Sequence, residues 1–533
     1  MLLFFLQLCR WSRPTSAGRH FATTQVSTRC VAFIPRNHKE GIVDDSDSRV
    51  FPDPSKRVIS RRRLLQGAAA AALAAAAAAC APASPPAPTQ APAKPAAGAP
   101  APTTGAAAPA PTSAAPAASA PTAAASSATA PYGPWWPPTA AKPSGGQLKI
   151  GTIYPLSGSL ALLGEESWRG AELARLVQNQ NGGLLGKEII WDKTDAPDPN
   201  AAVSQANRLI STDKIQIIVG SYSSTLAQAG SEVAERNKVI WWEEGGISDP
   251  IVERGFQYLF RTCAEASGFG TVTIDFTKSV IAPKLGIAPD KLKVAIVHED
   301  GLYGTTVGNA EEKGGKAAGL NIVTNEPYSA TATDLSSLIL KLKSMQPDVL
   351  WATSYIQDAL LFWKQARDVN FAPKAVIGSG GGYSLTDFAK GLGNDANGIL
   401  NADFTQYNIS PNYAKGLNEY VKLYQDTFKE PPRSGHSLAN FVGTQFLWDT
   451  IAKAGSSDPD AVRKAALTLD IPEGQTASGW GCKFAGPTEK QAGQNLRALP
   501  VLMEWKNGAQ YTIYPTNAAV ADVTLPWKPS WAK

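Results

Sequence analysis

Two short apolar runs, each closed by a polar loop, constrain the fold of this chain more than any other feature. The first covers residues 215–220 and ends in glycine, and the second covers residues 239–242. Short apolar runs of this kind are typical of strands buried in a parallel sheet. A helical pattern over residues 226–237 lies between them, so the stretch predicts a strand–helix–strand unit of an α/β sheet.

Small polar residues follow both runs. Ser223, Ser224 and Thr225 follow the first run, and residues 245–248 follow the second. Ligands of open α/β sheets bind at the carboxyl ends of the strands. The first turn of a helix also has unpaired N–H groups that favour an anion. We therefore expect an anionic ligand group here, although the pattern fits equally well an alternative in which the three hydroxyls only cap the helix.

The same alternation continues along the chain and predicts two doubly wound α/β lobes. Asp198 and Pro199 mark a helix start, because Asp caps helices and Pro suits the first helical position. Residues 398–404 are expected to cross back to the first lobe, and Asn507-Gly508 to form the turn of a final hairpin within residues 499–514. The other predicted strands cover residues 147–154, 187–192, 293–297, 349–353 and 375–377, and further helices cover residues 164–179, 268–280, 440–454 and 459–469.

The residues before the globular part predict export. Three arginines, Arg61–Arg63, precede an alanine-rich apolar run over residues 67–79 and then Cys80. This order is typical of a signal peptide, and the run is short for a membrane span. The arginines resemble the twin-arginine export motif, and residues 77–80 resemble a bacterial lipobox in which Ala77 replaces the usual leucine. We expect a lipidated Cys80 at the mature N-terminus; the alternative is a signal that is cut elsewhere.

Composition separates the leader and a tether from the globular part. Residues 1–57 show no periodicity, and we expect translation to start near Val58, ahead of a signal over residues 58–79. Residues 80–145 are mostly Ala, Pro, Thr and Ser, which cannot bury enough apolar surface to order the chain. This segment therefore predicts a disordered tether that holds the globular part away from a membrane.

Charge and cysteine content exclude several functions. From residue 80 onward, 38 Lys and Arg stand against 40 Asp and Glu, so the net charge of +5 comes from the leader. The globular part has no basic footprint for nucleic acid. Its two histidines, His298 and His436, and its cysteines show no metal-ligand spacing, so we expect neither metal nor cofactor. Cys263 and Cys482 could pair in an oxidising compartment, but two buried thiols are the favoured alternative.

From Gln147 onward the chain resembles the solute-binding proteins of branched-chain-amino-acid-type ABC importers. Each resembling segment is weakly specific alone, but their order and spacing extend over most of the globular part. The segments are residues 149–158, Arg169–Ala174, Asn181–Gly186, Arg254–Thr262 and Tyr303-Gly304, with a looser match over residues 486–495.

This resemblance implies a type I periplasmic binding fold, in which two Rossmann-like lobes are joined by a three-crossing hinge and hold the ligand between them. On this plan, residues 146–266 begin the first lobe and residues 267–402 form the second. Residues 403–490 return to the first lobe, and residues 491–533 close the second and form a tail.

The resemblance also implies the binding residues. In the family, hydroxyls and amides of the first lobe bind the ligand carboxylate. The matching positions here are Ser223, Ser224 and Thr225, together with Gly246, Ile247 and Ser248. The second lobe closes with tyrosines, here Tyr303 and Tyr355, and in the family a carboxylate after a second-lobe strand binds the ligand ammonium.

The chain departs from the family pattern at three places. The second-lobe loop around Gly380 contains no acid, and Leu163 replaces an aromatic residue of the first loop. Trp242, Glu243 and Glu244 stand where the family has small or apolar residues. We expect one of these acids to supply the missing carboxylate and Trp242 to form a flat apolar wall; alternatively, the acids are solvated loop charges. The sequence therefore does not favour a branched-chain amino acid as the ligand over an amide, a urea-like molecule or an aromatic acid.

The implied function is capture of a small polar solute outside the cytoplasm, without catalysis, and its delivery to an ABC permease. The expected partners are the solute, the permease and, through the lipid anchor, the outer face of the cytoplasmic membrane; the protein is expected to be a monomer. One alternative is a solute-sensing receptor domain. Another is a serine hydrolase using Ser223 or Ser224 with His298, but the chain has no Gly-x-Ser-x-Gly elbow.

Overall fold

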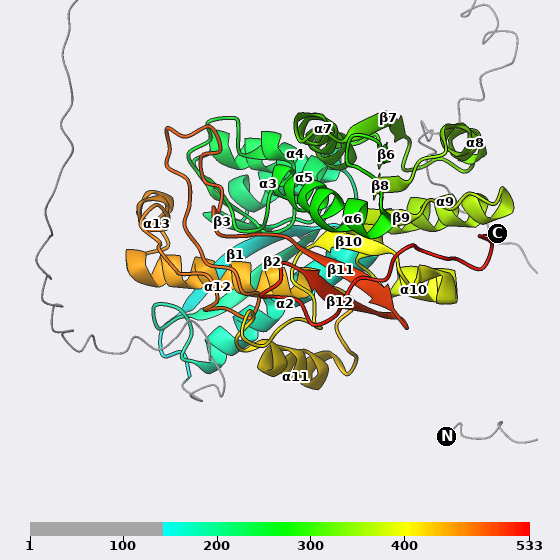
Figure 1. Ribbon diagram of the computed structural model, residues 1–533. Coiled ribbons are helices and arrows are strands. Elements are labelled where there is room, and N and C mark those ends of the chain that lie inside the picture. The colour runs from blue at the N-terminus through cyan, green and yellow to red at the C-terminus, as the bar shows by residue number, and fades with distance from the viewer. Residues whose placement is uncertain (1–141, 533) are drawn as a thin grey trace, which may run out of the picture. The chain divides into compact units, whose positions relative to one another are not determined.

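The computed structural model describes residues 142–532, and Figure 1 shows them as a ribbon. The predicted leader, the signal, Cys80 and nearly all of the tether lie outside these residues. Among the helices of residues 142–532, none has the length and apolar character needed to cross a membrane. The predicted α/β class is confirmed, since the strands form one five-stranded and one seven-stranded sheet.

The first sheet is built entirely from parallel strands in the order β2-β1-β3-β4-β5. Asp198 caps α3 as predicted, because its carboxylate accepts a hydrogen bond from the N–H of Ala201. The strands are β1 (Gln147–Tyr154), β2 (Glu188–Asp195), β3 (Ile217–Gly220), β4 (Ile240–Glu243) and β5 (Leu259–Arg261), and the helices between them are α2 (Ala161–Gln180), α3 (Pro199–Ser211) and α4 (Ser224–Arg236).

The second sheet has the order β12-β11-β10-β9-β8-β6-β7, and only its β10–β11 and β11–β12 pairings are antiparallel. Its strands are β6 (Lys293–Glu299), β7 (Asn321–Tyr328), β8 (Val349–Thr353), β9 (Ala375–Ser379), β10 (Leu400–Asp403), β11 (Val501–Lys506) and β12 (Ala509–Tyr514). Its helices are α5 (Ala266–Phe276), α6 (Ala282–Leu285), α7 (Leu302–Ala317), α8 (Ser336–Met345), α9 (Ile356–Asp368) and α10 (Thr386–Leu392).

One segment differs from its prediction. Residues 398–404 were expected to cross back to the first lobe, but Leu400–Asp403 form β10, which pairs with β9 and β11 in the second sheet. The return begins after β10, and leads to α11 (Leu417–Phe428), α12 (His436–Ala454) and α13 (Pro459–Ala466). The chain thus passes between the two sheets after β5, after β10 and before β11, which gives three crossings.

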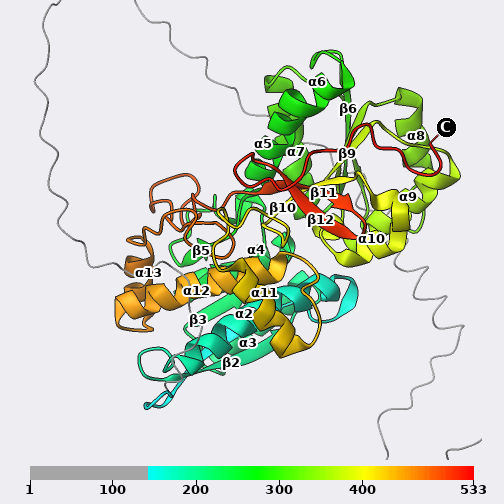
Figure 2. The same ribbon diagram turned by 60° about the horizontal axis from the view of Figure 1, so that its bottom comes forward.

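Helix α12 belongs to the core of the first lobe and packs along α2, as Figure 2 shows. A Cβ atom placed on Gly170 of α2 would lie 1.9 Å from the carbonyl oxygen of Ser437. Glycine at position 170 therefore allows the two helix backbones to approach closely. Beside this contact, the buried carboxylate of Glu166 accepts hydrogen bonds from Ser437 Oγ at 2.6 Å and from the hydroxyl of Tyr424 at 2.7 Å.

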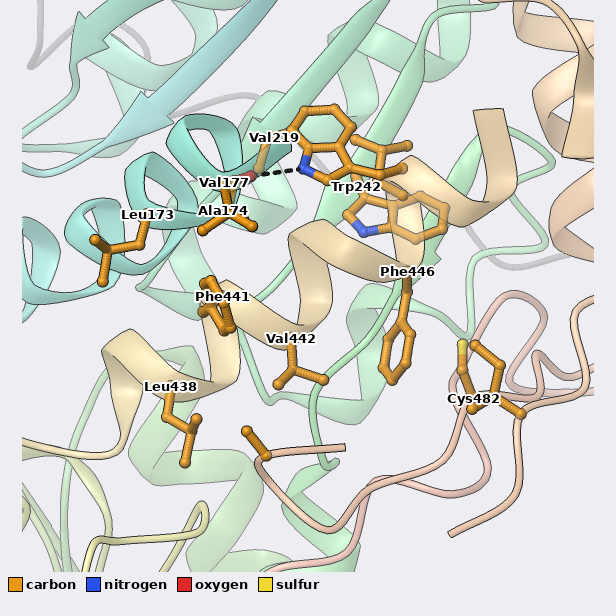
Figure 3. Packing of buried hydrophobic residues seen from close by; sticks show 14 of the residues in the cluster. Leu173, Ala174, Val177, Val219, Trp242, Leu438, Phe441, Val442, Phe446 and Cys482 are labelled. Atoms are coloured by element: carbon orange, nitrogen blue, oxygen red, sulfur yellow. Dashed lines mark hydrogen bonds between the residues drawn. The ribbon is translucent and has the colours of Figure 1, made fainter. Parts of the chain in front are cut away.

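The core cluster between the first sheet and α12 contains Trp242 and Cys482, which are labelled in Figure 3. The indole of Trp242 packs 5.8 Å from the Phe260 ring and 5.3 Å from the Phe484 ring, measured between ring centroids. Its Nε1–H donates to the carbonyl of Gly443 at 2.9 Å. Cys263 and Cys482 are both buried and free, as the favoured alternative for them predicted.

Candidate functional site

A cavity with about 310 Å³ of space, part of it open to solvent, lies where strands of both sheets end. We call it the interlobe cavity. From the first lobe, Ser224 follows β3 and Ile247 follows β4; from the second lobe, Gly380 follows β9 and Asp403 ends β10. Residues of both lobes thus line one cavity at the carboxyl ends of strands, which is where ligands of open α/β sheets bind.

The first-lobe wall is formed by the start of α4 and the loop after β4. Ser224 is the first residue of α4, and its Oγ accepts a hydrogen bond from the N–H of Ser248 at 3.2 Å. The N-cap residue, Ser223, makes no side-chain capping bond, so it leaves the N–H groups of the first helical turn without that partner. Such N–H groups and the positive end of the helix dipole favour a negatively charged ligand group.

A buried arginine supports this wall from behind. Arg261 is fully buried at the end of β5, and its guanidinium donates to the carbonyl of Gly246 at 3.2 Å and to that of Ser248 at 2.7 Å. These bonds hold the loop after β4 in place. The guanidinium also has a carboxylate partner of its own, because its Nη2 lies 3.7 Å from Oε2 of Glu265.

Aromatic side chains of both lobes form the sides of the cavity. The rings of Tyr303 and Tyr355 from the second lobe lie 5.4 Å apart, and the ring of Tyr222 from the first lobe lies 6.2 Å from that of Tyr355. The Tyr303 hydroxyl donates to the carbonyl of Ser379. Burial raises the pKa of all three phenols. Phe269 and Phe404 complete these sides.

The cavity also contains a buried carboxylate, that of Asp403. Its oxygens accept hydrogen bonds from the N–H of Phe404 at 2.7 Å, from Gln406 Nε2 at 3.3 Å and from Ser384 Oγ. A Cβ atom placed on Gly380 would lie 3.2 Å from Asp403 Oδ1, and Gly380 has a φ of +72°. Glycine at this position therefore suits the backbone and leaves Oδ1 uncovered on that side.

His436, the first residue of α12, lies beside Asp403. Its ring stacks edge-on against Tyr222 at 5.5 Å and tilts against Phe404 at 5.0 Å, and its Nδ1 lies 3.2 Å from Ser434 Oγ. Burial raises the pKa of Asp403, and the nearby His436 opposes this shift. Burial lowers the pKa of His436, and Asp403 opposes it. A cationic ligand group would favour the ionised form of Asp403.

The structure brings five of the predicted site residues to the interlobe cavity, namely Ser224, Ile247, Tyr303, Tyr355 and Gly380. Ser223 and Thr225 lie on a second space, which shares Tyr355 with the cavity. We call this second space the acidic chamber, and the residues used below to describe it are Ser223, Thr225, Glu299, Tyr355, Gln357 and Asp358. Ser223 Oγ lies 2.9 Å from Thr225 Oγ1 and 3.5 Å from the Tyr355 hydroxyl.

The other predicted site residues do not line the cavity. Trp242 lies in the core, and the Glu243 carboxylate accepts hydrogen bonds from the N–H groups of Gly245 and Gly246 at 2.9 and 2.6 Å and from Trp241 Nε1 at 2.8 Å. Ser248 donates from Oγ to the carbonyl of Leu302 in the second lobe at 2.9 Å. These three residues hold the walls together in this structure.

Glu244 is also enclosed by protein. Its carboxylate accepts hydrogen bonds from Thr444 Oγ1 at 2.8 Å and from the hydroxyl of Tyr154 at 3.1 Å. Burial raises the pKa of Glu244, and the two hydrogen bonds oppose this shift. The alternative of solvated loop charges is wrong for both acids, since Glu243 and Glu244 have no exposed surface.

Five side chains of the cavity were not predicted from the sequence, and Asp403 is the most important of them for the chemistry of the cavity. Asp403 was overlooked because residues 398–404 were interpreted as a crossing, although an apolar run that ends in Asp is also the pattern of a strand closed by a binding residue. His436 sits before the helix predicted over residues 440–454 and gave no signal of its own. The overlooked side chains are those of Tyr222, Phe269, Asp403, Phe404 and His436.

Comparison with known proteins gives one family and several similar structures. The model of the family described as "Periplasmic binding protein" matches residues 147–508. Leu/Ile/Val-binding protein homolog 8 of Brucella abortus is 42% identical over 375 residues, which are 70% of this chain and 92% of that protein. Homolog 7 of Brucella suis is 40% identical over 387 residues, which are 72% of this chain and 96% of that protein.

Solved structures share the fold at low sequence identity. The branched-chain amino acid transporter substrate-binding protein LivJ of Streptococcus pneumoniae, in complex with isoleucine, has a TM-score of 0.59 at 20% identity, covering 71% of this chain and 100% of that one. A solute-binding protein of an ABC transporter from R. palustris, in complex with benzoate, has a TM-score of 0.59 at 22% identity, covering 70% and 98%. The predicted two-lobed fold is thus confirmed.

Proposed function

We propose a ligand and a mode of capture for this chain from the premise that it belongs to the periplasmic binding protein family, whose model matches residues 147–508. The chain is accordingly a solute-binding protein of an ABC transporter rather than an enzyme, and it acts outside the cytoplasm. The names of its relatives point to leucine, isoleucine and valine, and the R. palustris structure points to aromatic acids. The residues of the interlobe cavity distinguish between these ligand classes.

The ligand that the cavity fits best is an α-amino acid in its zwitterionic form. Its carboxylate would lie against Ser224 and the N–H groups at the start of α4, above the buried Arg261. Its ammonium would lie against the carboxylate of Asp403 on the opposite wall. Asp403 carries this proposal, because a simple aromatic acid such as benzoate has no cationic group to balance a second buried negative charge.

The remaining site residues take roles that follow from their positions. Tyr303 and Tyr355 would cover the ligand from the second lobe, and Gly380 would leave room beside Asp403 Oδ1. Glu243 and Ser248 would act indirectly by holding the binding loop, and Trp242 by packing beneath it. Ser223 and Thr225 would contact only a ligand that extends into the acidic chamber.

Capture would proceed by hinge closure. The ligand would dock on the first lobe, and the second lobe would close over it around the three crossing segments. The closed form would deliver the solute to a membrane permease, while lipid on Cys80 and the tether over residues 80–145 would keep the protein at the outer face of the membrane. The resemblance of residues 77–80 to a lipobox supports the anchor.

Calorimetric titration of the full chain with leucine, 3-methylbutylamine, 4-methylpentanoate and benzoate tests the ligand. We expect leucine to bind, and we expect 3-methylbutylamine and 4-methylpentanoate, which each lack one charged group of leucine, to lose at least about tenfold in affinity. Asp403→Asn should lower the affinity for leucine by a similar factor or more. Asp387→Asn, on the surface of α10, is the matched control and should change nothing. Tight binding of benzoate that survives Asp403→Asn would refute the proposal.

A further inference from the structure

We propose that the acidic chamber binds the cationic end of an elongated ligand, so that the solute is a basic amino acid with an ammonium or guanidinium group at the end of its side chain. This inference rests on the proposed function, in which the α-carboxylate and α-ammonium occupy the interlobe cavity. The chamber shares Tyr355 with that cavity and has about 970 Å³ of space, part of it open to solvent. The two spaces are therefore neighbours, and in this proposal the ligand side chain extends past Tyr355 into the chamber.

The first observation is a buried, unpaired carboxylate oxygen on Asp358, a residue that lines the chamber. Asp358 is 2% exposed, and its Oδ2 accepts hydrogen bonds from the Tyr328 hydroxyl at 2.8 Å and from the N–H of Tyr355 at 3.2 Å. Its Oδ1 is buried and has no hydrogen-bond partner. Capping of α9 explains Oδ2 only. A buried acceptor without a partner costs free energy, which a ligand donor would recover.

The second observation is a further carboxylate in the same wall. Glu299, at the end of β6, accepts from the N–H of Gly301 at 2.6 Å with Oε2 and from the N–H of Gly304 at 2.6 Å with Oε1. Each carboxylate oxygen can accept more than one hydrogen bond, so both retain capacity for a ligand donor. These two bonds also fix the position of the carboxylate before any ligand arrives.

The third observation is the absence of a balancing positive charge. The side chains lining the chamber include no Lys or Arg, and within residues 142–532 neither Glu299 nor Asp358 forms an ion pair. Burial raises the pKa of Glu299 and raises that of Asp358 to about 7. An ammonium or guanidinium bound between the lobes would supply the missing charge and several donors. A neutral branched side chain would supply neither.

Titration of the full chain with arginine, lysine, leucine and norleucine tests this inference. We expect arginine or lysine to bind at least about tenfold tighter than norleucine, which has a straight chain without the charge. Asp358→Asn should remove most of this preference. The affinity for norleucine should stay unchanged, because an amide oxygen can still accept a hydrogen bond from the Tyr355 N–H. Asp300→Asn, an exposed acid next to Glu299 that does not line the chamber, is the matched control and should keep the preference.

A second variant tests the inference if Asp358→Asn does not fold. Gln357 is exposed and lines the chamber, so Gln357→Lys should fold normally while placing a cation inside it. This variant should lower the affinity for arginine by about tenfold or more and leave the affinity for leucine unchanged. Equal affinities for arginine and norleucine in the unaltered chain would overturn the inference, yet leave the proposed function intact. Binding of putrescine but of no amino acid would overturn the inference together with the proposed function.

Discussion

The carboxylate of Glu243 accepts hydrogen bonds from backbone N–H groups that would otherwise face one another without an acceptor. Three N–H groups, those of Ser221, Gly245 and Gly246, point to its Oε1 at 2.6–2.9 Å, and Trp241 Nε1 donates to its Oε2. A buried carboxylate that accepts several N–H groups organises a loop in the way a bound anion does. The family resemblance could not have suggested this, because the family has small or apolar residues at that position.

Replacing Glu243 with glutamine should therefore destabilise the protein. Glutamine keeps one acceptor oxygen but turns an NH₂ group toward buried donors, which leaves at least one of them unpaired. We expect a loss of about 1–3 kcal/mol in the free energy of unfolding, measured with urea. Glu232→Gln on the exposed face of α4 is the control and should change stability by less than about 0.5 kcal/mol. Equal stability of the two variants would show that the Glu243 network is dispensable.

Glu311 leads to a prediction about pH. It is fully buried on α7, accepts from Ser379 Oγ at 3.0 Å, and burial raises its pKa to about 8. In the unfolded chain its pKa has the ordinary value of about 4.5, so between these pH values the folded state holds a proton that the unfolded state has lost. Its contribution to stability is therefore complete below about pH 4.5 and is lost as pH rises to about 8.

Glu311→Gln should remove this dependence. The free energy of unfolding of the variant should rise relative to that of the unaltered chain as pH increases from 5 to 8, by at most about 1.4 kcal/mol per pH unit. Above pH 8 the difference between the two proteins should level off. Urea unfolding at several pH values measures it. A stability difference that stays constant between pH 5 and pH 8 would contradict a raised pKa for Glu311.

Single residues also show how far the sequence alone can predict the site. Ser224, Tyr303 and Tyr355 were found because each follows a predicted strand or lies in a family segment. Asp403 is the last residue of a strand, but that strand was not recognised. Trp242 was expected at the ligand because it stands next to a binding loop. Successive side chains of a strand point to opposite faces of the sheet, and the sequence did not reveal to which face Trp242 points.

At the scale of elements, the strand and helix positions were largely predictable, and their packing was not. The apolar runs at residues 215–220 and 349–353 contain β3 and β8, because burial of a parallel strand on both faces requires such a run. The contact between α2 and α12 joins residues that are far apart in the chain. No local pattern indicates that Gly170 lies against Ser437.

This helix contact gives a prediction about stability. In Gly170→Ala the new methyl group would overlap the Ser437 carbonyl, which belongs to a backbone and cannot rotate away. We expect the two helices to separate and stability to fall by about 1–3 kcal/mol or more, measured by thermal and urea unfolding. In the control, Gly268→Ala on α5, the nearest atom lies 3.5 Å from the new Cβ, so stability should stay level or rise slightly. A neutral Gly170→Ala would disprove the close packing.

At the scale of the whole molecule, alternating strands and helices predicted two α/β lobes, but not the order of strands within them. The second sheet runs β12-β11-β10-β9-β8-β6-β7, and its antiparallel edge comes from the last strands of the chain. Such an order depends on which crossings the chain makes. That is why a misplaced crossing at residues 398–404 concealed both a strand and its acid.

The contacts between the lobes lead to a prediction about ligand release. Ser248 was expected to touch the ligand, but its Oγ donates to the carbonyl of Leu302 across the lobes at 2.9 Å. Ser248→Ala would remove this bond and leave the cavity walls unchanged. Since one such bond is worth roughly 0.5–1.5 kcal/mol, affinity should fall about two- to tenfold through faster dissociation. Stopped-flow and calorimetric titration measure both quantities for the ligand that binds.

Selectivity separates this role from direct ligand contact. If Ser248 only joins the lobes, Ser248→Ala should weaken every bound amino acid by the same factor, because closure is common to all of them. Ser211→Ala, at the exposed end of α3, is the matched control and should leave dissociation unchanged. A Ser248→Ala variant that weakens one amino acid and spares another would instead place the hydroxyl at the ligand in the closed form. The interlobe bond would then be a resting contact that ligand replaces.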